Sequence, residues 1–139
     1  MKLLAVIALV AASAAPARGQ CVNVSKAGTQ GTFTGILEKH AFPGPPNFED
    51  VAKGDRPMET FILRLPTNIC IQDNGRFADP DERFNTIHIS SYDQGIPWGW
   101  LDAHLGVQVT LTGNIFASEN AFHMAPLVMM LPNGWKPPE

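Results

Sequence analysis

Residue types that build catalytic and metal centres are scarce in this sequence. It has only two cysteines and four histidines, and the cysteines do not form a Cys-x-x-Cys pair. His40, His88, His104 and His123 stand singly, so the His-x-His and His-x-x-x-His spacings of metal sites are missing. The Gly-x-Ser-x-Gly turn of serine hydrolases and a phosphate-binding glycine loop are missing too. We therefore expect no catalytic residues, no metal and no cofactor.

Basic residues are also few. Lysine and arginine number 10 against 13 acidic residues, and two of the ten, Lys2 and Arg18, lie in a segment that we expect to be removed. Nucleic acids and anionic lipids bind basic surfaces. The charge balance therefore argues against both as partners.

Only one apolar run is long. It spans ten residues, 3–12, whereas a transmembrane helix needs about 20. A basic start precedes this run and small residues follow it, which is the layout of a secretory signal peptide. We predict a signal peptide over 1–19, a single mature domain over 20–139 with a proline-rich tail, no transmembrane anchor, and a periplasmic or secreted location.

An exported protein with two cysteines is expected to join them in a disulfide, here Cys21 with Cys70. Antiparallel pairing of the first two expected strands brings both sulfurs to the same end of the domain. Two alternatives remain: a lipid anchor on Cys21, which the long polar Gln20 before it disfavours, and free thiols.

Strand-like runs and turns dominate the rest of the chain. Val, Ile, Thr and Phe enrichment and period-two alternation predict strands, while Trp98, Leu101 and Leu105 share one face of a short helix. The expected strands are 30–42, 60–70, 85–90, 107–118 and 125–131, with the helix at 97–105 and Gly106 just past its end. Five strands with a helix between the third and fourth predict an all-β, OB-like barrel, and another small antiparallel barrel or sandwich is the alternative.

Two details of this pattern can be checked. In the second strand Phe61, Leu63 and Leu65 are expected to face the core, and Thr60, Ile62 and Arg64 the solvent. The acidic residues are expected to be solvated or mutually neutralised at the surface; they are Glu49, Asp50 and Asp55 in one loop and Asp73, Asp79, Asp81 and Glu82 in another.

The stretch "FPGPPNFEDVAKGDRPMETFILRLPTNIC" resembles the bacterial family called domain of unknown function 4431. The resemblance rests on Phe-Pro-Gly-Pro-Pro-Asn, on the Lys-Gly-Asp that follows, and on the strand that ends in Ile-Cys. Later, "LGVQVTLTGNIFAS" and "APLVMM" are similar to the family's closing strands. The resemblance implies an exported, single-domain bacterial protein and supplies no activity.

Function is therefore expected to lie in binding. OB-folds bind ligands across their second and third strands, between the loops that here span 43–59 and 118–125. The candidate ligand-binding residues are Phe42, Pro45, Pro46, Asn47, Trp100 and His123. We predict a non-catalytic binding module for an envelope protein or a glycan. The alternatives are a purely structural envelope protein and an enzyme whose site, for example around His88 and His123, forms only on folding.

Overall fold

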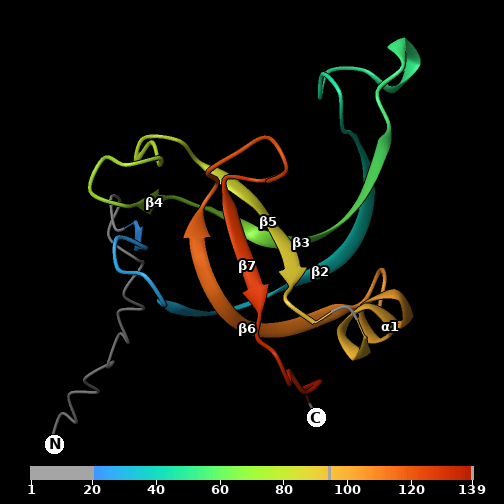
Figure 1. Ribbon diagram of the computed structural model, residues 1–139. Helices are drawn as coiled ribbons and strands as arrows, with labels where there is room; N and C mark the ends of the chain where they lie inside the picture. The colour runs from blue at the N-terminus through green and yellow to red at the C-terminus, as the bar shows by residue number, and fades with distance from the viewer. Residues whose placement is uncertain (1–20, 94, 139) are drawn as a thin grey trace, which may run out of the picture.

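Five strands form a mixed sheet that closes on itself as a ring. The computed structural model describes residues 21–93 and 95–138, so the predicted signal peptide lies outside the described residues. The ring runs β2, β3, β5, β7, β6 and back to β2 (Figure 1). Its strands are β2 (Gln30–Pro43), β3 (Pro57–Ile69), β5 (Phe84–Ser91), β6 (Gln108–Ala117) and β7 (Leu127–Leu131). All neighbours are antiparallel except β5 and β7, which are parallel.

The core fills the inside of this ring. Leu37, Leu63, Ile87, Leu111 and Met129 are almost completely buried, one from each strand. Successive side chains of a strand point to opposite faces of a sheet. On the second expected strand, Phe61, Leu63 and Leu65 are buried, as predicted.

Glycines allow the strands of the ring to approach closely. A Cβ atom at Gly35 of β2 would collide with the carbonyl oxygen of Arg64 on β3, and one at Gly113 would lie 2.8 Å from that of Met130. These glycines therefore permit a close approach that a side chain would prevent.

A disulfide joins Cys21 to Cys70 and ties the start of the described chain to the end of β3. Its two sulfurs are used, so the lipid-anchor and free-thiol alternatives are wrong. Beside it, β1 (Val22–Asn23) and β4 (Ile71–Gln72) form a short parallel pair that was not predicted. The disulfide fits an oxidising compartment.

The helix α1 (Ile96–Ala103) lies between β5 and β6, as expected, and ends two residues before the predicted boundary. Trp98 stacks on Phe61 of β3, with ring centroids 5.4 Å apart, so it contributes to the core as predicted. Leu105 lies beyond the helix and is 39% exposed, so its predicted place on the buried face was wrong. In the described part of the chain no helix has the length and apolar character to cross a membrane.

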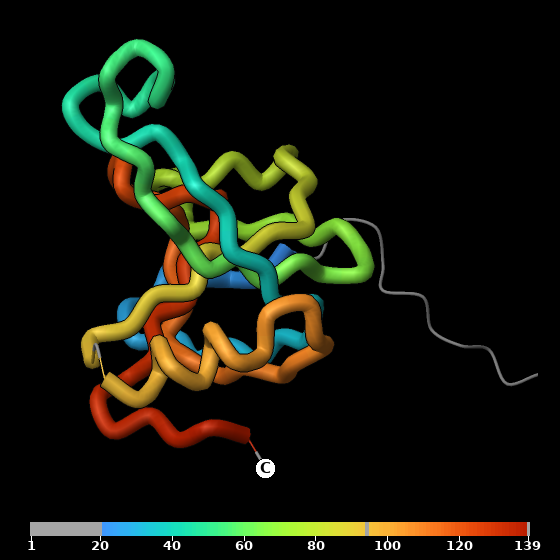
Figure 2. Tube along the Cα trace, turned by 90° about the vertical axis from the view of Figure 1, so that its right-hand side faces the viewer, coloured from blue at the N-terminus to red at the C-terminus, as the bar shows by residue number. Residues whose placement is uncertain are grey.

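The C-terminal tail returns to α1 (Figure 2). Trp135 packs edge-on against Trp100 at 5.5 Å, and Trp100 stacks on His104 at 3.9 Å. The tail therefore covers one side of the helix.

Candidate functional site

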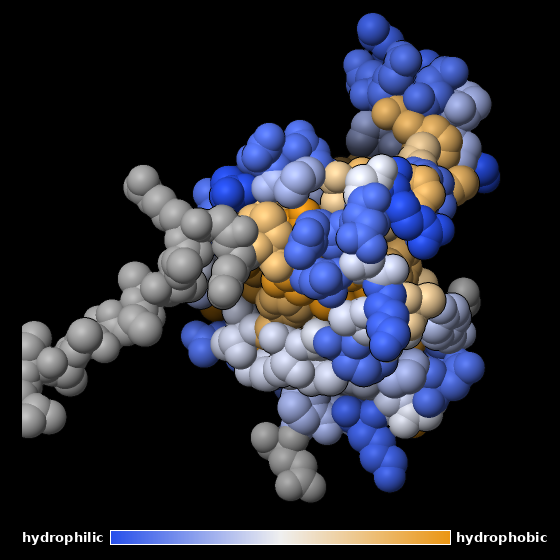
Figure 3. Space-filling view, turned by 90° about the vertical axis from the view of Figure 1, so that its left-hand side faces the viewer, coloured by the Kyte–Doolittle hydropathy of each residue, from blue (hydrophilic) through white to orange (hydrophobic). Residues whose placement is uncertain are grey.

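The β2–β3 hairpin projects from the ring and carries the proline-rich segment at its tip (Figures 1 and 2). We call residues 44–56 the hairpin loop; it contains the short 3-10 helix η1 (Val51–Lys53). The tip is hydrophilic and the base is hydrophobic (Figure 3). Pro46 and Asn47 are exposed, whereas Phe42 and Pro45 are half-buried. The loop thus stands away from the ring instead of lying over its end.

Asp55 fixes the shape of the hairpin loop. Its side chain is buried, and its carboxylate accepts backbone N–H bonds from Asn47 and Glu49, both at 2.8 Å, and from Asp50 at 3.0 Å. The bonds from Asp50, Glu49 and Asn47 hold the pKa of Asp55 below its ordinary value, because they stabilise the charged form. The expectation that Asp55 is neutralised at the surface was wrong.

Asp73 does the same for the loop that precedes β5. Its buried carboxylate accepts N–H bonds from Arg76, Phe77 and Ala78 at 2.6–3.1 Å. Burial alone would raise the pKa of Asp73, but these three donors hold it below its ordinary value. Asp73 was predicted to be solvated, and that was wrong as well; the neighbouring Asp79, Asp81 and Glu82 are exposed, as expected.

A groove of about 390 Å³ lies at the base of the β2–β3 hairpin, on the outer face of the ring. Ile62 on β3 was expected to face solvent, but only 3% of its surface is exposed, and Thr60 is also buried. The groove is lined by His40, Ala41, Phe42, Ile62, Thr86 and Met124. Most of this lining is apolar, so the outer face of β3 carries a hydrophobic surface that alternation along the strand did not reveal.

Met124 reaches the groove from the segment that connects β6 to β7, which we call the closing loop (residues 118–126). Phe122 of this loop packs edge-on against Phe48 of the hairpin loop, with ring centroids 5.0 Å apart. The two loops that were expected to border the ligand face therefore contact each other beside the groove.

Two histidines hold the closing loop. His88 on β5 accepts the backbone N–H of Met124 at Nδ1 (3.0 Å), and His123 accepts that of Glu119 at Nδ1 (2.9 Å). Their rings lie 6.2 Å apart. Because each Nδ1 accepts a bond, each ring is neutral with its proton on Nε2. Neither Nδ1 lone pair is free to bind a metal or to act as a base.

The environment of both rings favours this neutral form. Burial, and to a smaller extent the neighbouring His123, lower the pKa of His88 to about 4. Burial also lowers the pKa of His123, while Glu119 opposes the change.

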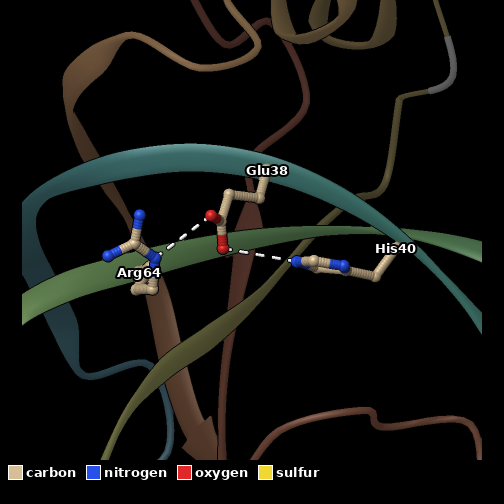
Figure 4. A network of polar contacts seen from close by, with 3 residues as sticks. All are labelled: Glu38, His40 and Arg64. Carbon is tan, nitrogen blue, oxygen red and sulfur yellow. Dashed lines mark hydrogen bonds and ion pairs between the residues drawn. The ribbon is translucent and has the colours of Figure 1, made fainter.

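Glu38 and His40 on β2 form a polar network with Arg64 on β3 (Figure 4), and His40 also lines the groove. Glu38 lies between Arg64 and His40, accepting from Arg64 Nε at 3.1 Å and contacting His40 Nε2 at 3.3 Å. Burial alone would raise the pKa of Glu38, but His40 and Arg64 keep it below its ordinary value. This carboxylate therefore orients both side chains.

The predicted site residues do not all meet. Phe42 lines the groove, His123 lies in the closing loop behind it, and Pro45, Pro46 and Asn47 belong to the hairpin loop. Trp100 lies on α1, at the other end of the ring from the hairpin loop (Figure 1). Sequence reasoning missed Ile62, Thr86 and Met124. The Asn-Ala-Phe-His-Met run in the closing loop, apolar in a turn, was the available signal for the last of them.

No protein-family model, curated protein or solved structure matches this chain. Within residues 21–93 and 95–138, no group of three or more His, Cys, Asp or Glu side chains is placed to hold a metal ion. The chemistry of the site therefore has to be argued from the groove: an apolar floor, neutral imidazoles and one oriented ion pair are suited to binding.

Proposed function

We propose that this protein is an exported, non-catalytic binding module with an OB-like barrel, and that it binds an extended segment of an envelope protein in the groove. The order of five strands, with the helix between the third and fourth, supports the OB-like assignment. The disulfide supports a periplasmic or secreted location. The resemblance to domain of unknown function 4431 stays a prediction, since no family model matches the chain, and it adds no ligand.

The position of the groove is the observation that carries the proposal. It lies on the outer face of β2, β3 and β5, of which β3 and β5 are the second and third strands of the ring, and beside the contact between the hairpin loop and the closing loop. Ligand sites of OB-folds occupy this place. The hairpin loop is held in one shape by Asp55, so little conformational entropy is lost when it contacts a partner.

The lining favours a protein segment over a glycan. Sugars are held by exposed aromatic rings, often tryptophan. Trp98 and Trp100 pack against other aromatic side chains at α1, away from the groove. Ala41, Phe42 and Met124 instead offer an apolar surface to an apolar side chain, above the buried Ile62, while His40 offers a polar contact.

A direct test is selection of peptides that bind the purified domain from a random phage-displayed library, followed by mapping of amide shift changes by NMR. We expect changes at Ala41, Ile62 and Thr86, and none at Thr32 and Thr112, which are exposed on β2 and β6. Oligosaccharides are titrated in parallel. A failure to select any binder, or changes confined to other faces, would show that the groove is not the ligand site; changes at the groove caused by oligosaccharides alone would reassign the ligand as a glycan.

A further inference from the structure

The closing loop is attached in two different ways. At its base, the N–H of Ser118 donates to the carbonyl of Pro126 (2.9 Å), next to the β6–β7 pairing. Closer to its tip, the N–H of Met124 donates to the imidazole of His88 on β5, and the N–H of Glu119 donates to the imidazole of His123, which lies in the loop itself. Backbone carbonyls accept at any ordinary pH, whereas an imidazole accepts only while it is neutral. The attachment of the tip therefore depends on neutral imidazoles, whereas the backbone pairing of the ring does not.

Protonation would reverse both of these bonds. An imidazolium carries N–H on both nitrogens, so its Nδ1–H would face the N–H of Met124 or Glu119. Two charged rings at this separation would also repel each other. The base of the loop and the strands would keep their backbone bonds, so the change can stay local.

The charged groups near the two imidazoles influence the pH at which each imidazole becomes protonated. The closing loop contributes Glu119, and the loop before β5 contributes Asp79 and Glu82, which border a cavity with His123. On the sheet, Ile62 of β3 pairs with His88 on one side and with Glu38 on the other, so it separates the two. Arg64 of β3 pairs with Thr86, two residues before His88 on β5. Phe116 on β6 and Val128 on β7 are the uncharged neighbours.

We propose that His88 and His123 form a pH-sensitive latch: at neutral pH they hold Met124 at the groove and Phe122 against Phe48, and on acidification they release both. This inference rests on the proposed function for the meaning of the groove, but the latch itself does not require a ligand. It assigns to the closing loop the regulation of access to the site.

The sign and range follow from the lowered pKa values. A histidine whose pKa is lower in the closed state contributes stability that is complete above its ordinary value, 6.5, and is lost as the pH falls towards about 4. Release is therefore expected as the pH falls between these limits.

The latch is tested by NMR on the full mature domain. Nuclear Overhauser contacts between the rings of Phe48 and Phe122 report closure, and the imidazole resonances report protonation. The matched variant is H88N with H123N, because asparagine places an acceptor oxygen near the position of Nδ1 and does not titrate. We expect the wild-type contacts to disappear as the imidazoles protonate, and those of the variant to persist over the same range.

Two results would overturn the inference. One is persistence of the Phe48–Phe122 contacts after both imidazoles have protonated. The other is loss of these contacts only together with the methyl signals of Leu63 and Ile87, which would mean that the whole ring unfolds in the same step. If the double variant does not fold, the Phe48–Phe122 contacts are followed in the single variants H88N and H123N, each of which lacks one of the two titrating imidazoles. A working latch without any ligand at the groove would refute the proposed function alone.

Discussion

At the scale of single residues, the most informative side chains are two buried aspartates. Asp55 and Asp73 each collect three backbone N–H donors from their own loop. Buried carboxylates are stable when they are fully hydrogen-bonded, and here the donors come from the nearby backbone. In the hairpin loop these bonds act together with backbone bonds, such as that from the Arg56 N–H to the Pro45 carbonyl, and with the Phe48–Phe122 contact.

Asp55→Asn tests the first of these loops. Asparagine keeps the size of the side chain, but its NH2 group would face N–H donors that the carboxylate now accepts. We expect amide hydrogen exchange of Asn47, Glu49 and Asp50 to accelerate by at least about tenfold while exchange in the ring is unchanged. Glu49→Gln, at an exposed position in the same loop, is the control. Unchanged exchange in Asp55→Asn would mean that the loop is held by other contacts.

The pH dependence of the free energy of unfolding tests the loop that Asp73 organises. Because the pKa of Asp73 is lowered in the folded state, its contribution is complete above the ordinary value of 3.8 and is lost as the pH falls through the lower, folded value. Denaturant unfolding is therefore expected to show a loss of stability at acid pH that is smaller in Asp73→Asn. Asp79→Asn, on an exposed neighbour in the same loop, should retain the wild-type slope.

Sequence reasoning placed both aspartates at the surface. Charge is a sound guide to exposure, because unpaired charged groups are rarely buried. The donors that satisfy Asp55 and Asp73 are backbone N–H groups, and no pattern of side chains predicts where they converge.

At the scale of elements, the ring depends on the close approach of β2 and β3. Gly35→Ala would place a Cβ against the backbone carbonyl of Arg64, which cannot move without disturbing the strand pairing. We expect a loss of about 1–3 kcal/mol in the free energy of unfolding, measured with denaturant. Gly99→Ala in α1 meets no atom within 4 Å and should be neutral or stabilising. Equal effects of the two substitutions would show that the close approach of β2 and β3 at Gly35 does not require glycine.

The strands themselves were largely predictable, and their outer faces were not. Alternation correctly oriented Phe61, Leu63 and Leu65 towards the core, since all three are buried. Ile62 is also buried, because the closing loop, some 60 residues later in the chain, brings Met124 to the same groove. A contact between such distant segments has no local signature, so the groove could not be read from the strand alone.

At the scale of the whole molecule, the disulfide connects the N-terminal segment to the ring. It closes a loop with a sequence separation of 49. Replacing Cys21 and Cys70 together by serine should lower the free energy of unfolding by about 2–4 kcal/mol, mainly because the unfolded chain gains freedom. Denaturant unfolding of the double variant, compared with the oxidised and reduced wild type, measures this. A variant as stable as the oxidised protein would show that the bond contributes little.

The order of the elements, the disulfide pair and the loops on either side of the groove could be predicted from the sequence. The place of Trp100 could not, because it follows from the return of the tail to α1 through Trp135. The convergence of His88 with His123 could not be read from their spacing either, and their role emerges only from the backbone groups that each imidazole accepts.

The central claim is that the groove is the surface that binds a partner. The most direct measurement is photo-crosslinking in the native envelope from a benzophenone side chain at Thr86, in the groove, and at Thr112, exposed on β6 as the matched control. The account predicts one defined protein adduct from Thr86 and none from Thr112. Equal capture at both positions, capture from Thr112 alone, or no adduct at either would contradict it.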